Sequence, residues 1–169
     1  GAGIRPQNLA TYPIFSFSDN FVNNYLPFTI ELGRSFVQPN YQNSNENRSG
    51  LYALDNLWDG LGALIVRYPH MKYFFGKVTM YRTYNKQARN CLLYFLNKYF
   101  PDPDSLATAI DPLDYNAEKP YYRNIFVAGN YDDDYKTLVR EIRTYGERIP
   151  PLINSYMKIS PNMRVFGTT

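Results

Sequence analysis

The sequence predicts a mixed α/β fold, of the α/β or α+β class, from two kinds of periodicity. Residues 28–36 alternate apolar with polar side chains at all positions except Arg34, as is typical of a half-buried strand. Residues 51–68 carry apolar side chains at helical spacing. A strand pattern at 73–81 and a helix pattern at 85–100 follow, and this order indicates a βαβ unit.

The segments on either side of this unit follow from local signals. Residues 14–17 predict a short strand, and Ser18 with Asp19 can cap a short helix that ends at Leu26. Pro69 and Pro101 end the two long helices, because the residue before a proline disfavours helical geometry.

Beyond Pro101 the sequence predicts two more helices. One has acids in its first turn, basic residues in its second half and Gly146 at its exit, which suits the helix dipole and the C-terminal cap. Two prolines begin the other. In chain order we expect an acidic connection at 102–120, a strand at 125–128, a helix at 132–145, a helix at 150–158 and a strand-like segment at 163–166.

Composition favours a compact domain in a reducing compartment. The 169 residues fit one domain of ordinary size. No apolar run approaches the ~18 residues of a membrane span, and the single cysteine, Cys91, rules out an internal disulfide framework. We therefore expect a cytoplasmic location, which includes the inner face of the membrane.

Glu31 and Arg34 are the leading candidates for chemistry. With the apolar side chains of their strand on a core, Glu31 would face outward. Alternation would place Arg34 on the apolar face, but the preceding Gly33 is typical of a bulge that would turn Arg34 towards Glu31 and open a gap beside the strand. The alternative is a surface glutamate and an arginine that extends its charged end into water.

The motif Glu31-Leu-Gly-Arg34, followed by Ser-Phe-Val, resembles the Glu-x-x-Arg strand of acyl-homoserine-lactone synthases. It resembles more closely the related hemolysin-like N-acyltransferases that make ornithine and glycine lipids, and both groups belong to the GNAT superfamily. Segments 54–61, 73–76 and 149–156 fit the second group in the same order, so that the resemblance spans roughly residues 28–166.

The resemblance implies a GNAT-like mixed sheet flanked by helices. Residues 1–169 would form a single but partial acyltransferase-like domain, with N-terminal strands and a C-terminal segment outside this sequence. The implied activity moves a fatty acyl group from an acyl-carrier thioester to the amine of an amino acid, in lipid precursor synthesis. Acyl carrier protein or coenzyme A would present the acyl group as a co-substrate, and no cofactor would be bound permanently.

The implied mechanism gives each candidate residue a role. Glu31 would remove a proton from the amine. Arg34 would hold the substrate carboxylate or a carrier phosphate, which suits a planar guanidinium. Tyr84 or Tyr94 would reprotonate the thiolate, although among 17 tyrosines this choice rests on the resemblance alone.

Residues 38–50 lead from a strand into a helix N-terminus, where backbone N–H groups can hold a phosphate. The resemblance implies that this loop grips the pantetheine phosphates, here through Gln42, Arg48, Ser49 and Gly50. The usual pair of glycines is absent, which favours a carrier protein over acetyl-CoA. The alternative is an ordinary solvated loop.

Charges are segregated along the chain, although the net charge is only +3. No acid occurs between Asp59 and Asp102, which favours an acidic partner. We expect an acidic acyl-carrier protein and an amino-acid acceptor, with peripheral membrane contact and without nucleic acid; a solvated helix face is the alternative. The seven cations of this stretch are Arg67, Lys72, Lys77, Arg82, Lys86, Arg89 and Lys98.

Other chemistries have little support in the sequence. His70 and Cys91 lie far apart, so we expect no metal site. A Cys91 nucleophile with His70 as its base is an alternative, although Cys91 fits a helix core better. Two other functions stay open: a non-catalytic acyl- or carrier-binding module, and a basic domain that binds anionic membrane or nucleic acid.

Overall fold

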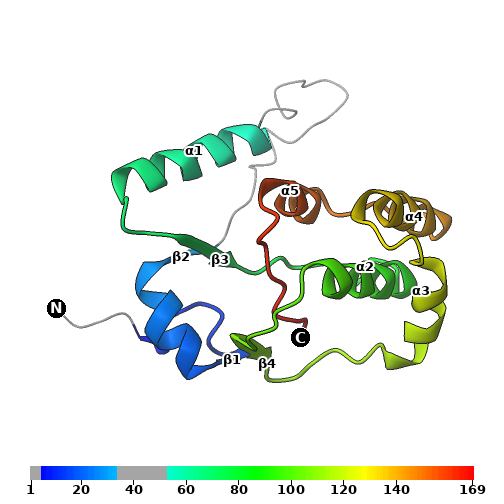
Figure 1. The fold of residues 1–169 in the computed structure, drawn as a ribbon, viewed down its shortest axis with the longest axis horizontal. Helices are drawn as coiled ribbons and strands as arrows, with labels where there is room; N and C mark the ends of the chain where they lie inside the picture. Colours follow the sequence, from blue (N-terminus) through cyan, green and yellow to red (C-terminus); the bar gives the residue numbers. More distant parts are fainter. Residues whose placement is uncertain (1–4, 34–52) are drawn as a thin grey trace. The chain divides into compact units, whose positions relative to one another are not determined.

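The computed structural model describes residues 5–33 and 53–169, which fall into two compact units (Figure 1). The first unit comprises Gly1–Pro13 and Asp19–Lys77, and the second comprises Ile14–Ser18 and Val78–Thr169. The predicted mixed α/β fold is confirmed, because helices alternate with short strands along the chain. The single domain over 1–169 stays a prediction.

A parallel strand pair organises the first unit. Strand β2 (Thr29–Leu32) pairs with β3 (Tyr73–Gly76), and helix α1 (Ala53–Arg67) lies between them in the chain (Figure 1). Parallel neighbours require a long crossover, which usually contains a helix. The predicted βαβ unit is therefore confirmed, although β3 ends at Gly76 rather than at residue 81.

The segment before β2 is made of short helical turns. These are a 3₁₀ turn at η1 (Pro6–Asn8), a π turn at η2 (Phe21–Tyr25) and a 3₁₀ turn at η3 (Leu26–Phe28). Phe21 is buried and its ring meets Phe75 of β3 edge-on, with ring centres 5.7 Å apart. This aromatic contact fastens the turns to the strand pair.

Four helices form the body of the second unit: α2 (Lys86–Tyr99), α3 (Lys119–Ile125), α4 (Tyr131–Thr144) and α5 (Pro151–Ile159). Asn85 sets the start of α2, because its side chain accepts the backbone N–H groups of Gln87 and Ala88. The buried core lies mainly between α2 and α4. It contains Ala88, Cys91, Leu92, Phe95, Leu96, Phe100, Tyr122, Phe126, Leu138, Ile142, Ile153 and Met157.

A small antiparallel pair completes the second unit. Strand β1 (Phe15–Phe17) pairs with β4 (Ala107–Ala109), with Phe15 opposite Ala109. Strand β4 and the 3₁₀ turn η6 (Asn116–Glu118) lie within the segment that the sequence predicts as an acidic connection. The described strands thus form one parallel and one antiparallel pair, and a GNAT-type mixed sheet stays a prediction.

Two of the strand predictions are wrong. Around residues 125–128, α3 ends at Ile125 and side chains then bind the backbone: Lys98 donates to the carbonyl of Phe126, and Asp134 accepts the N–H of Ala128. A strand would form its backbone hydrogen bonds with a neighbouring strand, whereas here side chains provide the partners. Residues 163–166 form no strand, and Val165 makes one backbone hydrogen bond, to the carbonyl of Phe100.

Candidate functional site

Glu31 lies within β2, and its carboxylate accepts three hydrogen bonds from the segment that precedes the strand. Oε2 accepts the N–H of Ala10 at 2.8 Å. Oε1 accepts both the N–H of Thr11, at 3.1 Å, and its hydroxyl, at 2.9 Å. Glu31 is half-buried, so it does not extend freely into solvent as the alternation suggests.

The described residues occupy all but one of the acceptor positions of the Glu31 carboxylate. Its two oxygens offer about four acceptor positions, and three are taken. The remaining position belongs to Oε2. A water molecule or a substrate amine could donate there while Thr11 and Ala10 hold the carboxylate in place.

The two strands approach closely at one end of the pair, which explains why residue 76 is a glycine. Leu32 lies opposite Gly76, and a Cβ on Gly76 would come within 2.8 Å of the Leu32 carbonyl oxygen. The ladder from Thr29 to Leu32 is regular, with no bulge in these four residues. The expected bulge at Gly33 concerns Arg34, which lies outside the described residues, as do Gln42, Arg48, Ser49 and Gly50.

Tyr84 precedes α2 in the second unit, with its phenol held by the backbone. Its hydroxyl donates to the carbonyl of Arg148 at 2.9 Å. Burial, followed by the negative charge of Glu147, raises the pKa of Tyr84 to about 12. The phenol is therefore protonated at neutral pH, as a proton donor must be.

Tyr94 lies within α2 and is part of an aromatic cluster. Its ring stacks on Phe126 with centres 5.8 Å apart and also contacts Tyr122 at 5.7 Å. Both Tyr84 and Tyr94 are partly buried against the same core, whereas Glu31 belongs to the other unit.

An ion pair between a partly exposed lysine and a buried aspartate, which the sequence analysis missed, joins α2 to α4. The Nζ of Lys98 lies 2.6 Å from the carboxylate of Asp134, which is fully buried. Tyr99 and the N–H of Ala128 also donate to Asp134. Burial opposes ionisation of Asp134, but these hydrogen bonds, with Lys98 foremost, outweigh it and hold the pKa of the carboxyl below its usual value.

Helical spacing carries a signal for this pair. Asp134 precedes the core residues Leu138 and Ile142 by four and eight positions, and Lys98 follows Phe95 by three. Both charges therefore lie on faces that are otherwise apolar. The pair also changes the interpretation of the expected basic stretch, since the charge of Lys98 is paired with a buried carboxylate of the second unit.

The acidic run at residues 132–134 lies in the first turn of α4. Asn130 is the N-cap, because its side-chain oxygen accepts the N–H of Asp133 at 3.0 Å. Within residues 5–33 and 53–169, no three or more His, Cys, Asp or Glu side chains gather as a metal ion would require.

Cys91 is buried in the core, which agrees with the structural interpretation of this thiol.

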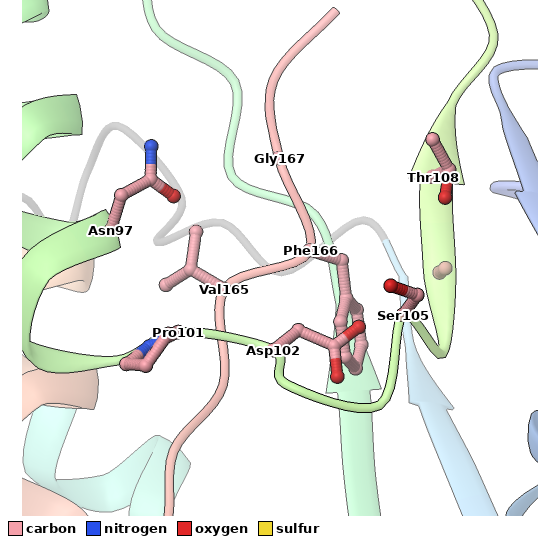
Figure 2. Close-up of a pocket in the computed structure, with 9 residues that line it drawn as sticks. Asn97, Pro101, Asp102, Ser105, Thr108, Val165, Phe166 and Gly167 are labelled. Atoms are coloured by element: carbon pink, nitrogen blue, oxygen red, sulfur yellow. The ribbon is translucent and has the colours of Figure 1, made fainter.

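A cavity of about 240 Å³ opens in the second unit, beside the end of α2 and β4 (Figure 2). It is smaller than the ~300–1,000 Å³ of typical ligand pockets. Asp102 on its wall is already engaged, because its carboxylate accepts the N–H of Leu106 and lies 3.4 Å from the guanidinium of Arg164. The cavity is lined by Asn97, Pro101, Asp102, Ser105, Ala107, Thr108, Val165, Phe166 and Gly167, so it includes no predicted site residue.

Comparisons with known proteins identify similar sequences. The chain is 53% identical over 160 residues to a glycine N(alpha)-acyltransferase of Phocaeicola vulgatus. The identity to a protein of the same name from Bacteroides thetaiotaomicron is also 53% over 160 residues. These alignments cover 95% of this chain but 49% and 48% of the relatives, so the chain spans about half their length. No family model and no solved structure matches the chain.

Proposed function

We propose that this chain is part of an N-acyltransferase that moves a fatty acyl group from a thioester to the amine of glycine. The observation that carries the proposal is the 53% identity, over 95% of the chain, to two proteins named glycine N(alpha)-acyltransferase. The Glu-x-x-Arg motif supports the same chemistry independently, through its resemblance to hemolysin-like enzymes of the GNAT superfamily. The product, an N-acylated glycine, would be a lipid precursor.

In this proposal Glu31 is the general base. Glycine is mainly an ammonium at neutral pH and cannot attack a thioester until it loses a proton. The acceptor position on Oε2 that no described residue occupies suits that proton, directly or through water. The three hydrogen bonds from Ala10 and Thr11 support the role, because a fixed carboxylate needs less ordering when the substrate binds.

Arg34 and Tyr84 complete the proposed mechanism. Arg34 would bind the carboxylate of glycine through its planar guanidinium. Tyr84 would reprotonate the thiolate that leaves, and it suits this role better than Tyr94, whose ring is stacked within the core. We expect Tyr84→Phe to lower kcat more than Tyr94→Phe does, in variants whose thermal stability has been compared.

We propose an acidic acyl-carrier protein as the donor, with coenzyme A as the alternative. Lys86 and Arg89 are three residues apart on α2 and so occupy neighbouring turns of one face, with Arg82 just before the helix. Helix α2 contains no acid that would repel an acidic carrier. Gln42, Arg48, Ser49 and Gly50 would hold the pantetheine phosphate, in a cytoplasmic protein that works at the inner face of the membrane.

The test uses the full-length protein with an acyl-carrier thioester and a panel of free amino acids. Thiol release and the mass of the acylated product are measured together. We expect glycine-dependent turnover that Glu31→Gln abolishes. Glu118→Gln is the matched control, because Glu118 is also half-buried and accepts a hydrogen bond, from Asn90.

Other outcomes would favour the two alternative functions. A wild-type protein that binds the acyl carrier without turnover would indicate a non-catalytic carrier-binding module. A protein with neither turnover nor carrier binding would favour a basic domain for anionic membrane or nucleic acid. Retained turnover in Glu31→Gln would leave the acyltransferase in place but remove Glu31 as its base.

A further inference from the structure

The end of α1 and the start of β3 expose an unusual density of apolar side chains. Val66 is 84% exposed, Ile65 49% and Tyr68 40%. Tyr73 and Phe74, which begin β3, are exposed as well. Isolated exposed apolar residues are normal on a protein surface, but a group of them, as at the end of α1, is typical of an interaction surface. Tyr73 and Phe74 point to opposite faces of their strand, so one of the two can extend this group.

Cations are interleaved with these residues. Arg67 and Lys72 lie in the same segment, Lys77 follows β3, and all three are exposed. The guanidinium of Arg67 lies 5.7 Å from the centre of the Tyr68 ring, and the ammonium of Lys72 lies 4.9 Å from that of Phe28. The positive charges thus lie against aromatic rings rather than apart from them.

We propose that residues 65–74, which we name the basic apolar surface, dock onto an anionic lipid bilayer. Exposed aliphatic groups can enter the boundary of the acyl chains, while cations contact anionic head groups. Tyr68 and Tyr73 suit the interfacial level, since a phenol combines an apolar ring with a polar tip. None of the described helices is long and apolar enough to cross a membrane.

The charges favour a bilayer over other occupants of this surface. A second copy docked symmetrically on the same surface would bring Arg67 and Lys72 of both copies together, and like charges at an interface are unfavourable. An acidic carrier protein would match the cations but not the exposed Ile65 and Val66. An anionic bilayer matches both, because it offers negative head groups above an apolar layer.

The test is co-sedimentation of the full-length protein with vesicles of phosphatidylcholine, either pure or mixed with phosphatidylglycerol. We expect binding to the mixed vesicles that weakens as salt rises. Val66→Asp should weaken this binding about tenfold or more, because it places a charge on the buried side of the contact. The matched control is Val127→Asp, since Val127 is also highly exposed, at 74%, but belongs to the second unit.

A second pair of variants tests the electrostatic part. Arg67→Glu should weaken binding to the mixed vesicles by more than the roughly fivefold expected for loss of one cation. Arg123→Glu, at an exposed position in α3, should have a smaller effect. All four side chains are exposed, so circular dichroism should show unchanged folding.

Several results would overturn the proposal. The proposal is wrong if the wild-type protein does not sediment with mixed vesicles. It is also wrong if Val66→Asp and Val127→Asp bind these vesicles equally well. A dimer that Val66→Asp dissociates, without any effect on vesicles, would assign the surface to a second copy instead. Catalytic activity is not a readout here, so the outcome is independent of the proposed acyl transfer.

Discussion

Thr11 and Glu31, twenty residues apart in the chain, are joined by two hydrogen bonds to one carboxylate oxygen. The N–H and the hydroxyl of Thr11 both donate to Oε1 of Glu31, at 3.1 and 2.9 Å, and Thr11 is only 1% exposed. A buried hydroxyl bonded to a charged group is costly to remove. Thr11 therefore positions the carboxylate that we propose as the base.

Thr11→Val tests this positioning, because valine keeps the size and the backbone N–H but lacks the hydroxyl. We expect the free energy of unfolding to fall by about 1.5–3 kcal/mol, the usual range for a hydrogen bond to a charged group. Urea unfolding followed by circular dichroism measures the change. Thr108→Val, at an exposed position on β4, should leave stability nearly unchanged. Equal effects of the two substitutions would contradict a positioning role for Thr11.

Gly76→Ala should destabilise the parallel strand pair by about 1–3 kcal/mol, a usual cost of overpacking. The new Cβ would lie 2.8 Å from the Leu32 carbonyl oxygen, which is backbone and cannot rotate away. Gly60→Ala in α1 is the control, since its Cβ meets nothing within 4 Å and alanine favours a helix. Thermal unfolding should therefore shift in opposite directions for the two variants. A neutral Gly76→Ala would mean that the strands can separate at no cost.

Asp134→Asn should lower the free energy of unfolding by about 2–3 kcal/mol at neutral pH. The expected loss is below the ~3–5 kcal/mol of fully buried pairs, because the Lys98 side chain remains 31% exposed and partly hydrated. Chemical unfolding provides the measurement. Asp133→Asn is the control, because the Asp133–Lys136 pair is exposed, and it should leave the unfolding midpoint unchanged. A similar small effect of both substitutions would show that the Lys98–Asp134 pair contributes little.

The same carboxyl should make stability depend on acid pH. The folded state holds the pKa of Asp134 below its usual value, so the unfolded state takes up its proton at a higher pH. The stabilisation is therefore present above about pH 4, the pKa range of an unperturbed aspartate, and is lost as the pH falls through the folded pKa. The stability difference between wild type and Asp134→Asn should shrink on acidification. A difference independent of pH would contradict this linkage.

Cys91 should resist alkylation in the native protein. Burial, followed by the negative charge of Glu141, raises the pKa of its thiol to about 12, and the side chain is fully buried. The thiolate is the reactive form, so labelling by iodoacetamide near pH 8 should require unfolding. Mass spectrometry in buffer and in urea would follow the reaction. Rapid labelling of the native protein would revive the nucleophile hypothesis.

The local signals in the sequence predicted helices α1, α2, α4 and α5 but missed α3, which lies where the sequence predicts a connection and a strand. Helix α2 begins one residue after the expected start because Asn85 serves as its cap, and the periodicity correctly places Cys91 and Phe95 in a core. The parallel pairing of β2 with β3 also follows from the βαβ order. These features depend on residues that are close in the chain or on the order of elements, which the sequence contains directly.

The sequence by itself determined the periodic elements, the Glu-x-x-Arg motif and the position of Glu31 on a strand. The tertiary structure decided which groups surround that carboxylate. It also placed Ile125 in α3 and made residues 126–128 a loop whose backbone is held by Lys98 and Asp134. The reason is physical. Hydrogen bonds between residues some twenty to thirty-six positions apart form only when packing brings their elements together, and no local preference encodes that meeting.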